Sequence, residues 1–497
     1  MSALGRFTEF DNSAARIMTE IATFVRPSPP VLNRTARLAP WLAESRALVR
    51  LGAPLVVTQL AQMAMPTTDV LMIGRLGQGP LAAAALANTI YIFAWLVGLG
   101  PSAAVAPIVA HILGAHPNEH ARVRAAVRIG MWSVLLLSPV LIIALAFAEP
   151  LLLALGQTPE LARAAAPYVL VLSLGIPFTL AFNVLRNFST ALSHPRAPLV
   201  VIFCAAFLNA FLDYGLIFGH FGLPRLGMIG AAIATSSANA FSFAAMAGLV
   251  TFAPAFRRFR IWRRFHRPDW ARLLEVYRLG ASIDLTMIFE IALFAGATLM
   301  MGPFGTAAVA AHQIAMNVPS ITFMVPLGLS MAATVRVGLA AGAGDKHAVR
   351  RAGFTAIALA TLFMALCGIV IANFPRTIAG LYLPVDAPEN ARAAALTITF
   401  LYVAAAFQIF DAIQVTAAFA LRGLKDARMP VILAGGSYWL VGFPLALFLG
   451  YGLDWQGFGI WLGLAASLAV AAITMLSRFA HLSGALRLSF GKTGETV

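Results

Sequence analysis

The sequence has little charge for its length. Only 11% of its 497 residues are Asp, Glu, Lys or Arg, whereas 60% are hydrophobic and the mean hydropathy is +0.83. A soluble chain of this length would divide into several domains covered by charged side chains, and there is too little charge here to cover even one. The apolar residues form blocks of roughly 20 to 30 residues separated by short polar loops, which predicts a polytopic, all-α membrane protein.

Sequence signals of enzymes and ATP-driven pumps are also missing. The two cysteines, Cys204 and Cys367, both fall inside apolar blocks, so they predict neither a disulfide framework nor a metal site. The chain contains no HExxH or GxSxG motif, and the Gly-Lys-Thr in residues 484–493 lacks the spacing of a phosphate-binding loop. We therefore expect no enzyme activity and no cofactor.

Basic residues are distributed unevenly between the predicted loops. Of the 35 Lys and Arg residues, 30 fall on the side of the two termini, and only five fall on the other side: Arg75, Arg163, Arg225, Arg376 and Arg392. The positive-inside rule then places both termini in the cytoplasm. The net charge of +15 is thus a topology signal, and we expect no nucleic-acid partner.

The hydropathy pattern predicts twelve spans in two six-helix lobes. The spans cover residues 48–72, 82–112, 126–148, 164–188, 197–219, 228–252, 275–301, 307–337, 352–374, 393–420, 430–450 and 457–479. The chain accordingly divides into a cytoplasmic extension (1–47), an N-terminal lobe (48–252), a basic cytoplasmic linker (253–274), a C-terminal lobe (275–480) and a cytoplasmic tail (481–497).

The two lobes also resemble each other in sequence. Residues 84–130 and 308–353 both begin Ala-rich and end in a Gly-Ala turn before an Arg-rich segment, so that Gly114 matches Gly338 at a separation of 224. Because six is an even number, both lobes enter from the cytoplasm and the repeat is parallel. This arrangement predicts two similar bundles around a central cavity, with access alternating as the lobes rock.

Five acidic residues fall well within the spans: Asp69, Asp213, Asp284, Glu290 and Asp411. A carboxylate at the bilayer centre costs roughly 3 kcal/mol on insertion scales, so each needs a compensating role. Such acids either brace two helices or serve as proton relays, ion sites or counter-ions for cationic substrates. For Asp284, close to the cytoplasmic start of its span, we favour the bracing role and can name no other.

Amides accompany two of these acids. Asn209 lies four residues before Asp213 and so shares its helix face, and Gln408 and Gln414 flank Asp411. An amide beside a carboxyl can hold a hydrogen-bond network whose geometry changes with the proton. Oxygen ligands of this kind suit a hard monovalent cation equally well, so the pattern leaves H⁺ and Na⁺ open.

Prolines interrupt several spans. Pro66 precedes Asp69 by three residues, and Pro177, Pro319 and Pro326 lie inside other spans. A proline removes a backbone hydrogen bond and allows a helix to bend. We expect bends here, either as static packing kinks or as hinges beside a cavity.

Five segments together resemble the NorM-like branch of the multidrug and toxic compound extrusion (MATE) transporters. They are "TTDVLMIGRLG", "NAFLDYGLIFG", "GLPRLGMIGAAIAT", "FEIALFAGATLMMGPFGTAAVAAHQIAMN" and "FQIFDAIQVTAAFALRGLKDARMP", and the likeness runs from about residue 48 to 480 in the family's order. The resemblance implies cation-coupled antiport of amphipathic, often cationic, organic compounds out of a bacterium across its inner membrane, by a multi-pass protein that we expect to be a monomer.

The resemblance also assigns roles to particular residues. In the N-terminal lobe it implies proton and substrate coupling by Asp69, Asn209, Asp213 and Thr235. In the C-terminal lobe it implies cation binding, with Na⁺ as one possible ion, by Glu290 and Asp411. Phe407 stands where some relatives have a tyrosine that contributes to the cation site, which argues against sodium there.

The main alternative within transport is a flippase for a lipid-linked precursor or another amphiphile. Such a protein would line its cavity with several cationic residues for a pyrophosphate group. The candidates Arg186, Arg336 and Arg422 lie near cytoplasmic span ends, where we expect them to extend to the membrane surface as anchors. A membrane-embedded enzyme lacks a catalytic cluster, and a channel lacks a ring of acids.

Overall fold

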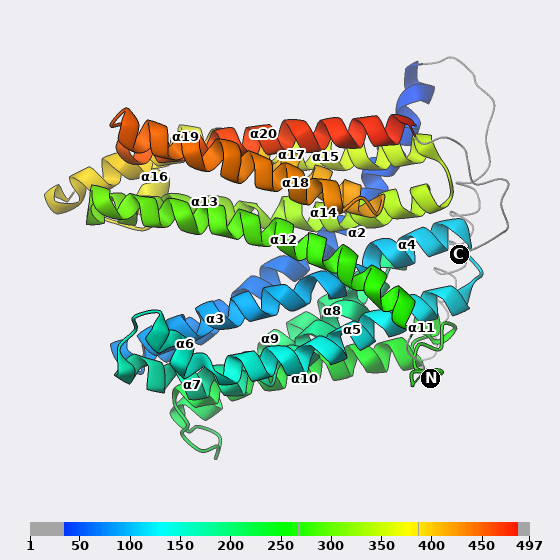
Figure 1. Cartoon of the computed structure of the whole chain (residues 1–497), viewed down its shortest axis with the longest axis horizontal. Helices are drawn as coiled ribbons and strands as arrows, with labels where there is room; N and C mark the ends of the chain where they lie inside the picture. Colours follow the sequence, from blue (N-terminus) through cyan, green and yellow to red (C-terminus); the bar gives the residue numbers. More distant parts are fainter. Residues whose placement is uncertain (1–33, 267–268, 386, 486–497) are drawn as a thin grey trace, which may run out of the picture.

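The computed structural model describes residues 34–266, 269–385 and 387–485, and every regular element in these ranges is a helix. Parts of the predicted cytoplasmic extension and tail, residues 1–33 and 486–497, lie outside the described residues. The helices form two bundles, one above the other in Figure 1.

The N-terminal bundle contains α2 to α11. Their bounds are α2 Arg34–Gly74, α3 Gln78–Ala103, α4 Val105–Ala115, α5 His120–Ala146, α6 Ala148–Ala154, α7 Pro159–Ser173, α8 Ile176–Ala191, α9 Arg196–Phe218, α10 Met228–Phe252 and α11 Pro254–Arg257.

The C-terminal bundle contains α12 to α20. Its elements are α12 Trp270–Met301, η1 Gly302–Phe304, α13 Thr306–Thr322, α14 Met324–Gly342, α15 Lys346–Asn373, α16 Pro375–Gly380, η2 Pro388–Asn390, α17 Ala391–Gly423, α18 Arg428–Gly435, η3 Gly436–Gly442, α19 Phe443–Leu447, η4 Phe448–Gly452 and α20 Gln456–Ala485.

The described residues contain 11 helices long and apolar enough to cross a membrane, or 12 when the bent pair α7 and α8 is counted as one span. This confirms the predicted twelve-helix architecture. The predicted span 164–188 is not one straight helix, because the chain bends by 41° between α7 and α8. Pro177 follows the break, and its ring and missing N–H disfavour a continuous helix through Ser173.

The outer surface of the bundles is apolar. Phe207, Leu299 and Leu440 are between 76% and 79% exposed, and many other large hydrophobic side chains join them. A soluble protein does not expose apolar surface on this scale, whereas the hydrocarbon of a bilayer covers it at no cost.

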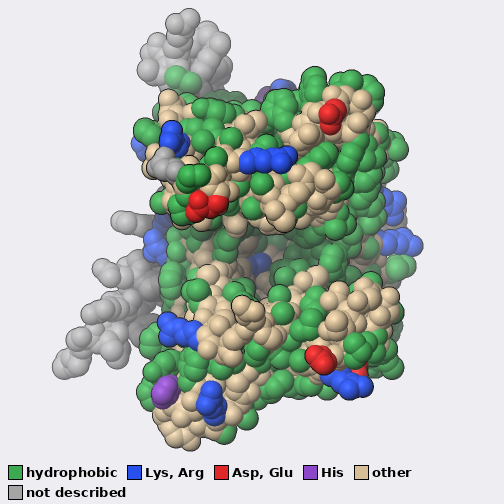
Figure 2. Space-filling view, turned by 90° about the vertical axis from the view of Figure 1, so that its left-hand side faces the viewer, with side chains coloured by type: hydrophobic (Ala, Val, Ile, Leu, Met, Phe, Trp, Pro, Cys, Tyr) green, Lys and Arg blue, Asp and Glu red, His purple; other side chains and the backbone are tan. Residues whose placement is uncertain are grey.

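The bundles touch at one end of the molecule and separate toward the other. Helix α14 of the C-terminal bundle packs against α2 and α4 of the N-terminal bundle. This contact lies at the end of the molecule where α2 begins and α20 ends (Figure 1). Viewed from the opposite end, the bundles enclose a hollow with basic side-chain atoms visible in its depth (Figure 2).

Glycines allow the backbones to meet at the closed end. A Cβ atom on Gly114 of α4 would overlap the carbonyl oxygen of Leu339 in α14. Reciprocally, a Cβ atom on Gly342 of α14 would overlap the carbonyl oxygen of His111 in α4. Only glycine permits so close an approach, so the two residues act as a matched pair across the interface between the lobes.

A second reciprocal contact involves the first helix of each lobe. A Cβ on Gly52 of α2 would lie 2.8 Å from Leu329 in α14, and a Cβ on Gly280 of α12 would lie 2.7 Å from the Cα atom of Pro101 in α3. Gly280 follows Gly52 by 228 positions, and Leu329 follows Pro101 by the same number. The lobes are therefore related by a pseudo-twofold axis between them.

The structure corrects the predicted register of the repeat. Gly114 is equivalent to Gly342, at a separation of 228, and not to Gly338 at 224. Gly77 and Gly305, also 228 positions apart, share the same unusual backbone conformation, with φ angles of 117° and 97°. The error is four residues, about one helical turn, so the apolar and small residues align almost as well in either register.

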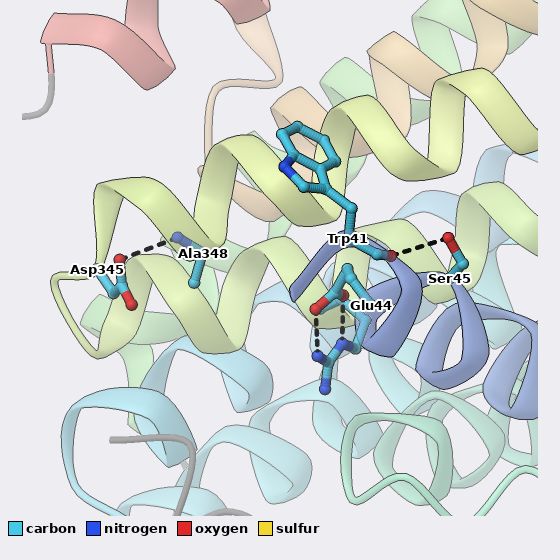
Figure 3. A network of polar contacts seen from close by, with 6 residues as sticks. Trp41, Glu44, Ser45, Asp345 and Ala348 are labelled. Atoms are coloured by element: carbon cyan, nitrogen blue, oxygen red, sulfur yellow. Dashed lines mark hydrogen bonds and ion pairs between the residues drawn. The ribbon is translucent and has the colours of Figure 1, made fainter. Parts of the chain in front are cut away.

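An ion pair joins the start of α2 to the opposite lobe. Glu44 is 1% exposed, and its carboxylate accepts hydrogen bonds from Arg336 of α14 at 2.8 Å (Nε) and 2.6 Å (Nη2), as Figure 3 shows. Nearby, Asp345 accepts a hydrogen bond from the backbone N–H of Ala348 and so caps α15 (Figure 3). Residues of the predicted extension thus take part in the contact between the lobes.

The linker between the lobes packs against the N-terminal bundle. Trp132 and Arg128 of α5 donate hydrogen bonds to the backbone oxygens of Phe265 and Arg264 at 2.7 and 3.0 Å. Tyr277, in the first turns of α12, bonds to the Ser133 carbonyl oxygen at 2.8 Å. Helix α12 therefore begins against the N-terminal bundle and ends in the C-terminal one (Figure 1).

The reciprocal glycine contact predicts the effect of one methyl group. We expect Gly342→Ala to push α14 away from His111 of α4 at a cost of about 1–3 kcal/mol to the observed packing. The lobes should then spend less time apart at the open end. Double electron–electron resonance between spin labels at Leu155 and Leu381, which are both exposed, would detect the shift as shorter distances.

The matched control is Gly248→Ala in α10, where a Cβ meets nothing within 4 Å. Both variants would be made with Cys204 and Cys367 replaced by Ser, since both cysteines are free. An identical distance distribution in Gly342→Ala and Gly248→Ala would contradict the role of the glycine pair.

Candidate functional site

The structure brings together the four residues expected to couple proton and substrate in the N-terminal lobe. Asp69 comes from α2, Asn209 and Asp213 from α9, and Thr235 from α10. The Thr235 hydroxyl donates a hydrogen bond to Asp69 Oδ2 at 2.8 Å, and Asn209 Nδ2 donates to Thr235 Oγ1 at 3.3 Å. A single network thus connects three helices.

The two aspartates of this cluster lie within hydrogen-bonding reach of each other. Asp213 is fully buried and Asp69 is 6% exposed, and neither oxygen of Asp213 accepts a bond from an N–H or O–H donor. No lysine or arginine in the described part of the chain acts on either carboxyl. Two such carboxylates repel when both are charged, and a proton shared between them removes the repulsion.

Tyr168 is a further member of this cluster that the sequence did not single out. It lies on α7, is 1% exposed, and interacts with the charges of both Asp69 and Asp213. Its hydroxyl is within hydrogen-bonding reach of Asn88 on α3. Tyrosines near span ends are common as interfacial anchors, so only the fold distinguishes this one.

The acids of the C-terminal lobe also meet. Glu290 on α12 is half-buried, and Asp411 on α17 is 6% exposed and lies close enough to interact with it electrostatically. Gln414 is within hydrogen-bonding reach of Glu290. Asp411 Oδ1 and Gln414 Oε1 are buried without a donor. These side chains form a polar cluster rich in oxygen atoms.

The Phe407 side chain contributes no ligand to this polar cluster. It is buried, with its ring centroid 5.6 Å from that of Trp461 on α20, and it belongs to an aromatic cluster that includes Phe400. Within the described ranges, no three His, Cys, Asp or Glu side chains converge as metal ligands usually do. A cation at Glu290 and Asp411 would therefore depend on amide and water oxygens for its remaining ligands.

The prediction that Arg186 and Arg422 extend to the membrane surface was wrong. Both are only 6% exposed, inside helix interfaces. Arg422 lies 4.2 Å from the ring centroid of Phe419 and interacts with the charges of Glu290 and Asp284. Position near a span end does not reveal whether an arginine points outward or into the bundle, and here the attraction of buried acids holds Arg422 inward.

Asp284 has the bracing role that we favoured. Its Oδ1 accepts a hydrogen bond of 2.5 Å from the backbone N–H of Gly100 in α3, across the interface between the lobes. At the pseudo-equivalent position of the other lobe, Val56 makes the corresponding contact with Gly328. One of the two related contacts is thus polar and the other apolar.

Comparison with known proteins places this geometry in a family. The MatE family model matches residues 54–215 and again 283–448. The probable multidrug resistance protein NorM of Mesorhizobium japonicum is 42% identical over 439 residues, which cover 88% of this chain and 94% of the relative. Its namesake in Burkholderia mallei is 39% identical over 471 residues, or 94% of this chain and all of the relative.

Solved structures share the fold. The crystal structure of the eukaryotic MATE transporter AtDTX14 superposes with a TM-score of 0.76 at 20% identity, covering 90% of this chain and 99% of that one. A structure described as the outward-facing conformation of a multidrug resistance MATE family transporter gives a TM-score of 0.78 at 20% identity, covering 90% and 97%. The family model and the NorM relatives confirm the resemblance found in the sequence, and these structures show the same fold.

The Asp284 contact makes a testable distinction between two substitutions. Asp284→Leu removes the hydrogen bond between the lobes at Gly100, which costs about 1–3 kcal/mol in a buried setting. Asp284→Asn keeps an acceptor oxygen, so we expect a smaller loss. Thermal unfolding of the purified proteins would check the order, with Asp284→Leu melting at the lowest temperature. Equal melting temperatures for the two variants would show that the bond does not stabilise the fold.

Proposed function

This chain belongs to the MatE family and is a multidrug efflux transporter rather than an enzyme, and we propose that it exports amphipathic, often cationic, organic compounds in exchange for protons. The Asp69–Asp213 pair would be the proton site. The observation that carries this proposal is the contact between two buried carboxyls on which no lysine or arginine of the described ranges acts.

Protonation of this pair would change its charge and its hydrogen bonds together. Without a proton, Asp69 accepts from Thr235 and presents a negative charge that attracts a cationic substrate. Addition of a proton lowers the negative charge of the pair by one unit and lets one carboxyl donate a hydrogen bond to the other. Because the partners lie on α2, α9 and α10, such a change would shift these helices and release the substrate.

The direction of transport follows from the orientation. We propose that both termini lie in the cytoplasm, as the placement of the basic residues predicts, in the inner membrane of a bacterium. The hollow in Figure 2 then opens to the outside, and the glycine contacts close the cytoplasmic side. In this state substrate would leave and a proton would enter, before the lobes rock to the opposite arrangement.

Sodium coupling at Glu290 and Asp411 is the second candidate. The unbonded oxygens of Asp411 and Gln414 favour it, since Na⁺ binds oxygen ligands. Against it, Arg422 already acts on the charge of Glu290, and Phe407 supplies no hydroxyl. A cation would have to compete with the guanidinium group, so proton coupling in the N-terminal lobe is better supported.

A lipid-precursor flippase fits the charges less well. Recognition of a pyrophosphate group needs several cationic side chains with free donors. Two of the three candidate arginines already interact with carboxylates. Arg336 forms an ion pair with Glu44, and Arg422 interacts with the charges of Glu290 and Asp284. One remaining arginine, Arg186, does not make a pyrophosphate site.

Substitution of the acids tests the proposal. In proteoliposomes containing ethidium as the probe, we expect a pH gradient alone to drive transport by the wild type and by Asp411→Asn. Asp69→Asn should abolish this transport, because an amide cannot gain and lose the proton, while the protein still inserts and folds. Dye fluorescence under separate pH and sodium gradients provides the measurement.

Asp454→Asn, at an exposed loop position, is the matched control and should transport normally. Transport that requires sodium and disappears in Asp411→Asn would place the coupling in the C-terminal lobe. Normal pH-driven transport by Asp69→Asn would reject the proposed mechanism altogether.

A further inference from the structure

Arg186 carries a buried positive charge with unusual partners. It lies on α8, and its Nη1 donates to Gln62 Oε1 at 2.8 Å and to Gln59 Oε1 at 3.3 Å, both on α2. Both partners are neutral amides. No acidic side chain of the described chain acts on Arg186. A guanidinium group buried without a counter-charge is destabilising unless something else neutralises it.

One edge of the Arg186 guanidinium group has no hydrogen-bond partner among the described residues. Its Nε is buried without an acceptor, and its Nη2 makes no hydrogen bond with the described residues while retaining exposed surface. The same chain shows what this edge can hold, because Arg336 uses its Nε and Nη2 to bind both oxygens of the Glu44 carboxylate. Arg186 offers that two-point site to a group that is not part of the protein.

The position of Arg186 follows from the helix to which it bonds. On α2, Gly52 and Val56 make the contacts with the opposite lobe, and Gln59 lies on the same helix face, one turn nearer the open end. Gln59 and Gln62 are both half-buried. Arg186 and its glutamines therefore lie just beyond the contact between the lobes, at the closed end of the hollow.

The opposite lobe has an acid at the equivalent place. Glu290 of α12 follows Gln62 of α2 by 228 positions, the separation that relates the two lobes. Where Gln62 bonds to Arg186 on α8, Glu290 lies against Gln414 on α17. The pseudo-twofold thus places a guanidinium group on one side of the hollow and a carboxyl on the other.

We propose that Arg186 binds a carboxylate of the transported compound, so that the hollow selects zwitterionic amphiphiles whose cationic end lies toward the acids. This inference rests on the proposed function and adds a specificity for it. A bare cation would lose nothing by the absence of Arg186, whereas a zwitterion would lose two charge-assisted hydrogen bonds. The alternative is that Arg186 only braces α8 against α2 through the two glutamines.

A pair of dyes separates these roles. The probes are a rhodamine dye with a free carboxylate and the methyl ester of the same dye, which differ in that one charge. For Arg186→Gln in proteoliposomes, we expect transport of the free acid, as kcat/KM, to fall by about tenfold to a hundredfold, from the loss of hydrogen bonds to a charged group. Transport of the ester should change by less than about threefold, within the range of a minor rearrangement.

The double variant Gln59→Leu, Gln62→Leu is the control for bracing. It removes both hydrogen bonds between α8 and α2 but keeps the guanidinium group, so it should still transport the free acid better than the ester. Arg186→Lys keeps the positive charge and should retain part of this preference. Binding of both dyes to detergent-purified protein, measured by fluorescence anisotropy, would show the same preference in any variant that folds but does not transport.

Two results would overturn the inference. Equal losses for acid and ester in Arg186→Gln, matched by the glutamine double variant, would make Arg186 a brace. Unchanged transport of both dyes would remove it from the binding site. Failure of the proposed function looks different, because the wild type itself would then move neither dye under any ion gradient.

Discussion

The free energy of keeping a charge away from water governs the interior of this protein. A buried ionised group is tolerated only beside an opposite charge, several hydrogen bonds or an open aqueous space. Glu44 meets this condition through Arg336, and Asp284 through the Gly100 N–H and Arg422. These pairs hold the lobes together at the closed end. Charges that lack such partners are the ones left to interact with ions and substrates.

Much of the fold could be predicted from hydropathy. All twelve apolar blocks became spans, because a bilayer requires backbone hydrogen bonds to be satisfied within helices. Hydropathy reports the thickness of the membrane and not the length of a helix, so α2 begins at Arg34 and passes through the charged residues Glu44 and Arg46, which lie outside the predicted span 48–72. The bend between α7 and α8 needed Pro177 to be weighed as a break, and nothing in the composition decided between break and kink.

The candidate site was predictable in part. Asp69, Asp213, Glu290 and Asp411 attract attention because an acid in an apolar run is costly. What the sequence could not give was their partners. Tyr168 meets the N-terminal acids from a helix about 100 positions away from Asp69, and Arg422 turns inward only because α12 brings two acids to it. The repeat register failed for a related reason, since small residues recur at every turn of these helices and only backbone contacts fix the alignment.

The two acid clusters differ in whether a basic group lies beside them, and this difference favours different functions for the two lobes. In the N-terminal lobe, no lysine or arginine of the described residues acts on Asp69 or Asp213, so no basic group offsets the change in local charge when a proton is gained or lost. In the C-terminal lobe Arg422 offsets part of the charge on Glu290 whether or not Asp411 binds a cation. A site that must switch needs an acid pair without a basic neighbour. A site that must offer a steady electrostatic field needs an acid beside a basic group. On this argument α2, which carries Asp69 and contacts α14 of the other lobe, is the element through which a proton would move one lobe against the other.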